Sequence, residues 1–186
     1  MSRVPVLDTE RLVMRGFRDD DQEQWAAIRA DDEVMRSLGR KGGVPLDEAW
    51  REMAMLAGHW ALKGFGHWAL EERSSGALIG NAGLFFPPDW PALEVGWTVA
   101  RPRWGEGFAG EAARAAAGWA QGQLGAGHLI SLIAPSNSRS LRVAEKLGMT
   151  HEGEAHVRGF RLLKYGSDLP FAGGDSGARG AGTGSQ

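Results

Sequence analysis

Residues 93–111, with the sequence LEVGWTVARPRWGEGFAGE, predict a β-strand, a short turn and the beginning of a helix. Val95, Trp97 and Val99 alternate with smaller or more polar residues, which is the period-two pattern of a half-buried strand. Pro102 cannot donate a hydrogen bond to a neighbouring strand, so we expect the strand to end before it. An alanine-rich run with high helix propensity follows. The stretch is therefore a strand-to-helix turn, and the other elements are interpreted relative to it.

Two glycines, Gly105 and Gly107, lie in this turn. A glycine turn leaves backbone N–H groups bare where the positive end of a helix dipole begins, and this combination attracts phosphate. The stretch lacks the Gly-Lys-Ser/Thr of a P-loop and the G-x-G-x-x-G of a dinucleotide site. Bound phosphates would therefore be held by backbone amides. These residues alone are equally compatible with a purely structural turn.

A second motif occupies residues 137–149, NSRSLRVAEKLGM. It resembles the Asn-x-x-Ser-x-x-Val-x-Glu-Lys-Leu-Gly-Phe motif of the GNAT acetyltransferases, in the branch of the RimJ/RimL-like ribosomal-protein alanine acetyltransferases. Residues 104–109 are similar to that family's acetyl-CoA motif, Gln/Arg-x-x-Gly-x-Gly/Ala, and residues 7–15, LDTERLVMR, to the first strand of the branch. The three motifs follow in the family's order, and the resemblance covers about residues 7–165.

The resemblance implies acetyl-CoA as a co-substrate and no metal. Backbone groups of Trp97 and Val99 would pair with the pantetheine arm, and the pyrophosphate would lie on the amides from about Trp104 to Gly110. Asn137 would hydrogen-bond the pantetheine arm, cap its own helix, or do both. The implied coenzyme-binding residues are Trp97, Thr98, Val99, Trp104, Gly105, Glu106, Gly107, Phe108, Ala109, Gly110 and Asn137.

The resemblance also implies two catalytic residues. Glu94 occupies a position where the branch has an acidic residue, and it would draw the proton from the amine, through water; the alternatives are an exposed strand residue or a contact for the ammonium. Members with a glutamate on the next strand would place it near Leu132, which cannot act as a base. The tyrosine that many GNAT enzymes use as an acid is replaced by Ala144, so Ser140 is the candidate for hydrogen-bonding the leaving sulfur. The alternative for Ser140 is a first-turn cap without a catalytic role.

Composition narrows the class of protein. A length of 186 residues suits one well-buried domain. A net charge of −2 and a pI near 6.2 give no basic footprint for nucleic acid. The chain has no cysteine, its five histidines include no i, i+4 pair, and no apolar run is long enough to span a bilayer. We therefore expect a cytoplasmic protein with neither nucleic-acid nor membrane partners.

The order of the elements predicts an α+β fold. With the resemblance, this means a GNAT fold: a central, twisted, mixed sheet of about six to seven strands with about four helices packed on both faces. The GNAT domain would span residues 1–166, and residues 167–186 would form a flexible, glycine-rich tail. The expected strands cover about residues 9–15, 66–71, 78–85, 93–99, 128–133, 149–157 and 159–165, and the expected helices about 19–30, 47–61, 111–125 and 137–148. Between two strands, the loop 87–91 is either a simple connection or part of a substrate pocket.

The expected activity is transfer of an acetyl group from acetyl-CoA to a primary amine by direct attack in a ternary complex. The acceptor is either a protein N-terminus or a small amine, such as a polyamine, an amino acid or an antibiotic. A different interpretation is an acyl-CoA-binding regulatory or assembly module without turnover. The family also makes a homodimer plausible, although no residue pattern in this chain indicates one.

Overall fold

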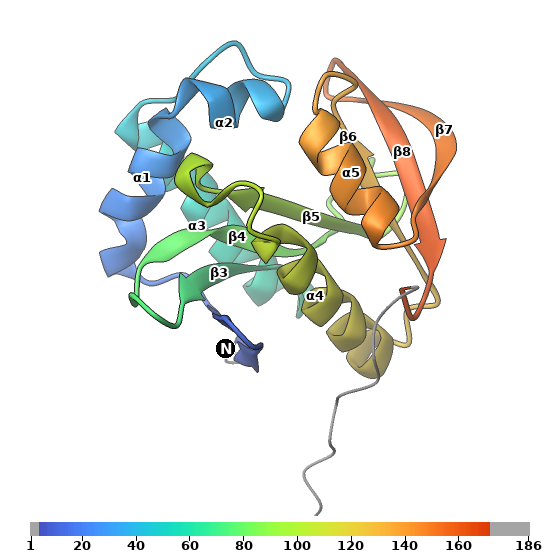
Figure 1. Ribbon diagram of the computed structural model, residues 1–186, viewed down its shortest axis with the longest axis horizontal. Coiled ribbons are helices and arrows are strands. Elements are labelled where there is room, and N and C mark those ends of the chain that lie inside the picture. The colour runs from blue at the N-terminus through green and yellow to red at the C-terminus, as the bar shows by residue number, and fades with distance from the viewer. Residues whose placement is uncertain (1–3, 172–186) are drawn as a thin grey trace, which may run out of the picture.

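The computed structural model describes residues 4–171. Its sheet has eight strands in the order β1-β2-β3-β4-β5-β6-β8-β7 (Figure 1). Neighbouring strands are antiparallel except β5 and β6, which are parallel. The strands are β1 Leu7–Asp8, β2 Leu12–Arg15, β3 His67–Glu72, β4 Leu78–Phe85, β5 Glu94–Val99, β6 His128–Ile133, β7 Thr150–Val157 and β8 Phe160–Asp168.

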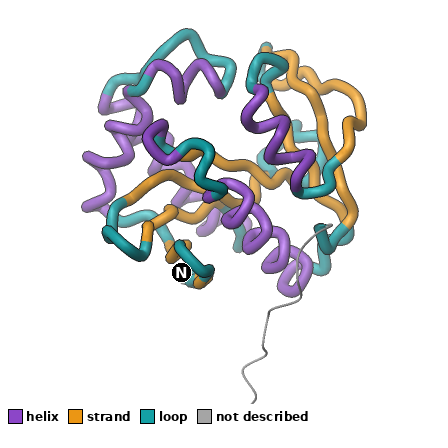
Figure 2. Tube along the Cα trace, in the orientation of Figure 1, coloured by secondary structure: helices purple, strands orange, loops and turns teal. Residues whose placement is uncertain are grey.

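Five α-helices cover the sheet. Helix α4 packs on β4 and β5, whereas α1 and α3 pack on each other and on the opposite face (Figure 2). The expected mixed sheet with helices on both faces is therefore confirmed. The helices are α1 Gln22–Ala30, α2 Asp32–Ser37, α3 Leu46–Lys63, α4 Phe108–Leu124 and α5 Ser138–Lys146, with short 3-10 helices at Asp19–Asp21 and Arg101–Arg103.

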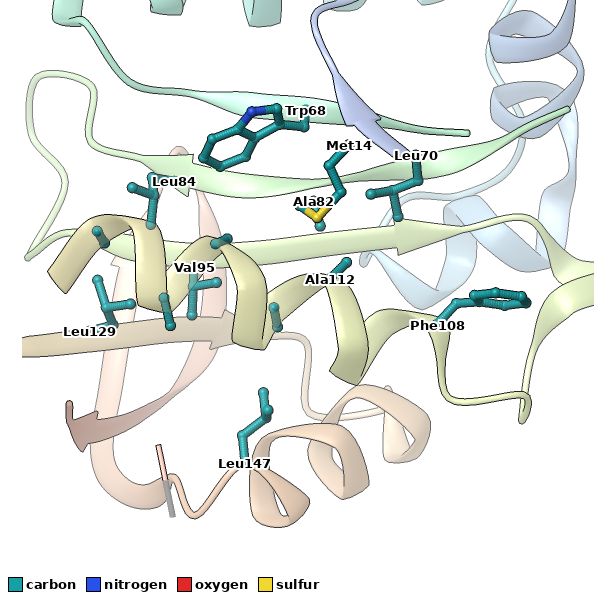
Figure 3. Packing of buried hydrophobic residues seen from close by; sticks show 14 of the residues in the cluster. Met14, Trp68, Leu70, Ala82, Leu84, Val95, Phe108, Ala112, Leu129 and Leu147 are labelled. Carbon is teal, nitrogen blue, oxygen red and sulfur yellow. The ribbon is translucent and has the colours of Figure 1, made fainter. Parts of the chain in front are cut away.

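The main core lies between α4 and the sheet. The buried face of α4 consists largely of alanine, whose small side chain lets the helix approach the strands closely; its alanines are Ala112, Ala113, Ala116, Ala117 and Ala120. Figure 3 shows Leu84 and Val95 beside this helix and Phe108 at its first turn. A second cluster, which includes Trp25 and Met53, joins α1 and α3 to the other face. The second cluster reaches the sheet at Ala69 and Leu78, whereas Val95 and Val99 of β5, the strand that carries Glu94, belong to the main core.

The sheet has more strands, and the fold more helices, than the sequence predicted. The expected single strand 9–15 is instead the hairpin β1–β2, in which Leu7 pairs with Met14 and the Thr9 N–H donates to the Leu12 carbonyl over 3.0 Å. Helix α2 was not expected; the Asp31 carboxylate caps it by accepting the Glu33 N–H over 2.9 Å. Both differences arise in short segments, where periodicity gives little signal.

The last strand continues to Asp168, beyond residue 166. Phe171 is buried in the main core, with 6% of its surface exposed. The segment 167–171 is therefore packed with the domain. The rest of the expected tail, residues 172–186, lies outside the described residues.

The parallel pair β5–β6 shapes the middle of the molecule. Its backbone register within the described residues consists of the single pair Glu94 and Ile130. Beyond that pair, side chains join the two strands: the Ser131 hydroxyl donates to the Val95 carbonyl over 2.6 Å, and the Leu132 N–H donates to the Glu94 carboxylate over 3.2 Å. β5 and β6 therefore separate beyond this pair, and the cavities described below lie where the two strands are apart.

Candidate active site

Two cavities meet beside the second half of β5. The turn cavity, about 770 Å³, is lined by the glycine turn, the start of α4 and one face of α5. The Glu94 cavity, about 310 Å³, extends from Glu94 toward α1 and α3. Six residues line both cavities: Ser37, Leu38, Trp97, Thr98, Asn137 and Ser140. This junction is where groups bound in the two cavities would come into contact.

The glycine turn has the geometry that its sequence predicts. Gly105 and Gly107 have φ angles of 87° and 90°, in the left-handed region that favours glycine. No side chain caps α4, which begins at Phe108. Within the described chain, the backbone N–H groups of residues 105–110 have no hydrogen-bond acceptor. The turn therefore presents a series of free donors at a helix N-terminus, where an anion binds favourably.

Ten of the eleven expected coenzyme-binding residues line the turn cavity; Glu106 does not. The Glu106 carboxylate lies 3.7 Å from Arg103 instead. Phe108 lines the cavity with little exposure, because its ring is buried in the main core. The Trp104 indole donates to the Val99 carbonyl over 2.7 Å, which leaves this carbonyl one lone pair for another donor.

Three cations on α5 line the same cavity. Arg139, Arg142 and Lys146 are spaced i, i+3 and i+7, and so lie on one face of the helix. The Arg139 guanidinium lies over the Trp104 ring, 4.4 Å from its centroid. None of the three cations has a carboxylate within 4.0 Å among residues 4–171. These charges are therefore free to interact with an anionic ligand.

Asn137 and Ser140 form a hydrogen-bonded unit at the junction. Asn137 caps α5, since its Oδ1 accepts the Ser140 N–H over 3.0 Å. Its Nδ2 donates to the Ser140 hydroxyl over 2.9 Å and to the Ser37 carbonyl over 2.7 Å. The Trp97 indole, which reaches across from β5, donates to the same hydroxyl over 3.2 Å. Because the Ser140 oxygen accepts two donors, its own proton remains available for a third partner.

Glu94 is buried at the start of β5, with 9% of its surface exposed, so it is not the exposed strand residue of one interpretation. Its Oε2 accepts the Trp90 indole N–H over 2.6 Å, and its Oε1 accepts the Leu132 N–H. Burial raises the pKa of Glu94 to about 7, although both hydrogen bonds act in the opposite direction. The carboxyl group can therefore exchange a proton near neutral pH. Trp90 also lines the cavity, which makes the loop 87–91 part of the pocket.

His67 and Asn81 were not predicted as site residues. They line the Glu94 cavity, with His67 Nδ1 2.9 Å from Asn81 Nδ2. Burial, with a smaller contribution from nearby His59, lowers the pKa of His67 to about 3, so the imidazole is neutral at pH 7. A Cβ added to Gly96 would lie 3.4 Å from the His67 ring and 3.7 Å from Glu94 Oε1. The glycine therefore keeps open the space between the imidazole and the carboxylate.

Among residues 4–171, no group of three or more histidine, cysteine, aspartate or glutamate side chains is placed to hold a metal ion. The same part of the chain contains no helix with the length and hydropathy needed to cross a bilayer.

Comparison with known proteins agrees with this geometry. The family model described as an acetyltransferase (GNAT) domain matches residues 11–150. The uncharacterized protein YkkB of Bacillus subtilis is 37% identical over 151 residues, covering 77% of this chain and 84% of YkkB. The crystal structure of an acetyltransferase from Agrobacterium tumefaciens is 29% identical, with a TM-score of 0.80, and the match covers 90% of this chain and 96% of that one.

The ribosomal-protein-S5-alanine acetyltransferase of Vibrio fischeri is 16% identical, with a TM-score of 0.69 over 88% of this chain and 96% of that one, so it shares the fold. The family model spans most of the chain and includes the glycine turn and the motif at Asn137. The protein therefore belongs to the GNAT acetyltransferase family, whose members are acyltransferases that use acetyl-CoA.

Proposed function

We propose that the protein transfers an acetyl group from acetyl-CoA to a primary amine by direct attack within a ternary complex. The observation that carries this proposal is the junction of the two cavities at Ser140, with Glu94 in the second cavity. A coenzyme in the turn cavity and an amine in the Glu94 cavity would meet there without a covalent enzyme intermediate. Holding the two reactants together in this way can lower the barrier by several kcal/mol.

The turn cavity suits the coenzyme. The free N–H groups of residues 105–110 would hold the pyrophosphate, and Arg139, Arg142 and Lys146 would attract the remaining phosphate charge. The pantetheine arm would run along residues 97–99 toward the junction.

The proton steps are assigned to Glu94 and Ser140. Glu94, ionised, would take one proton from the ammonium through water, and the free amine would attack the thioester carbonyl carbon. The tetrahedral intermediate would collapse with cleavage of the C–S bond, and the proton that its nitrogen loses to become the amide would pass to the leaving thiolate to form the thiol. The Ser140 hydroxyl would hydrogen-bond this sulfur as it leaves. The support is the raised pKa of Glu94 and the unassigned proton of Ser140.

The test combines a thermal shift with acetyl-CoA and thiol release across a panel of amines and N-terminal peptides. Stabilisation together with release on at least one acceptor supports the proposal. Stabilisation without release on any acceptor supports the other interpretation, an acyl-CoA-binding module without turnover. Absence of stabilisation contradicts both.

A further inference from the structure

We infer that the acceptor is a small monoamine with an apolar, preferably aromatic, body. This inference rests on the proposed function, because it takes the Glu94 cavity as the amine site. It selects among the acceptors that the motifs leave open: peptide N-termini, polyamines and other small amines.

The walls of the Glu94 cavity are mainly apolar. Six of its lining residues come from five separate segments and have aromatic or aliphatic side chains: Trp25, Met55, Leu56, Phe85, Trp90 and Leu162. Such a lining favours the apolar body of a ligand, and the few polar groups then fix its orientation. The volume of about 310 Å³ lies at the low end of the roughly 300–1,000 Å³ of ligand pockets. A single small body therefore suits it better than an extended peptide.

The charges of the lining favour one ammonium. Its charged side chains are Arg29, Glu52 and Glu94. Arg29 Nε lies 2.6 Å from Glu52 Oε2, and Arg29 Nη2 donates to Oε1 over 2.8 Å. Arg40 adds a further contact to Glu52, 3.0 Å long. Glu52 is therefore neutralised within the protein, and Glu94 has no cationic partner among the described residues.

A polyamine would need a second acid. One ammonium of spermidine can lie against Glu94, but its other ammonium groups would enter an apolar cavity beside a neutral His67, where the remaining charged side chains, Arg29 and Glu52, already pair with each other. An unpaired charge in such surroundings is costly. A monoamine avoids this cost.

The first test measures kcat/KM by thiol release with 2-phenylethylamine, spermidine and a tripeptide with N-terminal alanine. We expect 2-phenylethylamine to exceed the other two by at least about tenfold, the equivalent of 1.4 kcal/mol. Preference for spermidine or for the tripeptide overturns this inference and leaves the proposed function intact. If the protein binds the coenzyme but releases no thiol with any of these three substrates or with any amine of the wider panel, the proposed function itself is contradicted.

A matched pair of variants tests the charge argument. Met55 lines the cavity and is 44% exposed, so Met55→Glu adds a second carboxylate at its mouth. Leu62→Glu makes the same charge change on the same helix, at a residue that is 87% exposed and does not line the cavity. We expect Met55→Glu to raise kcat/KM for spermidine roughly threefold to fivefold and to lower it for 2-phenylethylamine. Equal effects of the two variants, or no change in the ratio of the two substrates, would contradict the charge argument.

A second, independent inference concerns the motif at residues 7–15. We propose that Arg11 is a positioning residue that holds the glycine turn in its phosphate-binding shape. Its Nη1 donates to the Glu106 carbonyl over 2.8 Å, and its Nε donates to Glu111 over 2.8 Å. The guanidinium also lies over the Phe108 ring, 4.4 Å from its centroid. Arg11 thus joins the turn to the first turn of α4 without lining the cavity.

Glu111 completes this anchor. Its Oε1 accepts the Thr9 hydroxyl over 2.6 Å and the Arg11 N–H over 2.9 Å. Burial raises the pKa of Glu111, but the hydrogen bonds from Thr9 and Arg11 outweigh it and leave the pKa below its usual range. The carboxylate is therefore ionised and paired at neutral pH.

The test compares Arg11→Ala with Arg51→Ala, an exposed arginine on α3. At a temperature where both variants are folded, we expect Arg11→Ala to raise the Kd for CoA about tenfold, with kcat at saturating acetyl-CoA unchanged. Arg11→Lys should restore little of the affinity for CoA, because an ammonium cannot bond Glu111 and the Glu106 carbonyl in the same fork geometry. An unchanged Kd in folded Arg11→Ala, or a loss confined to kcat, would overturn the proposal.

Discussion

The turn cavity and the Glu94 cavity are built in different ways. Backbone amides and exposed cations from two continuous stretches, residues 97–114 and 137–147, form most of the turn cavity. The Glu94 cavity is assembled from side chains on α1, α3, β3, β4, β5, β6 and β8, which are far apart in the chain. Local motifs therefore describe the coenzyme half of the proposed site, and the tertiary structure determines the acceptor half. Substitutions can therefore test the coenzyme half and the acceptor half of the proposed site separately.

The largest expected effect lies in the acceptor half. Glu94→Gln keeps the shape of the side chain and removes the base, so we expect kcat to fall about 10²- to 10⁴-fold while the thermal shift with CoA persists. Glu23→Gln is the control, because this residue is exposed and lines neither cavity. Unchanged turnover in Glu94→Gln would exclude Glu94 as the base.

The second-largest effect is expected at the junction of the two cavities. Ser140→Ala removes the free hydroxyl proton, and we expect a loss of about a hundredfold in kcat with little change in the KM for acetyl-CoA. Ser138→Ala, at an exposed hydroxyl of the same helix, should behave as the unaltered protein. If the loss in Ser140→Ala falls on KM alone, the serine binds coenzyme and does not assist the leaving group.

The contrast between local motifs and tertiary contacts also explains which parts of the molecule the sequence predicted and which it did not. The strand, the glycine turn and the helix of residues 93–111 were predicted from periodicity and propensity, because each signal is local. The β1–β2 hairpin was missed because its strands are short and because part of what holds its turn is Glu111, about 100 residues away. His67 was missed for the same reason: its partner Asn81 lies on the next strand, and a lone histidine carries no motif. The raised pKa of Glu94 depends on burial that only the assembled cavity provides.

A smaller effect is expected in the coenzyme half. The double variant Arg142→Gln/Lys146→Gln removes two exposed cations, and we expect the Kd for CoA to rise no more than about thirtyfold, since exposed pairs contribute up to about 1 kcal/mol each. Its affinity should also fall less steeply with added salt. Calorimetric titration at two salt concentrations measures both quantities, with Lys41→Gln, in an exposed loop, as the control. A loss that does not depend on salt would show that these cations do not act through charge.

The smallest expected effect is a shift along the pH axis. Since a base must be deprotonated to act, kcat/KM should rise with pH up to about 7, the pKa of Glu94, and be level above it. The Trp90 indole donates to Glu94 and so favours the charged carboxylate. Trp90→Phe removes that donor, so the pKa should increase and the midpoint of the profile should move to higher pH, by up to about one unit. At pH 6 this lowers the rate by less than about tenfold, and on the plateau it leaves the rate unchanged.

Trp50→Phe, at an exposed tryptophan outside the cavity, should leave the profile in place. A midpoint that moves to lower pH in Trp90→Phe, or that stays fixed, would show that the titrating group is not Glu94, even if Glu94→Gln is inactive.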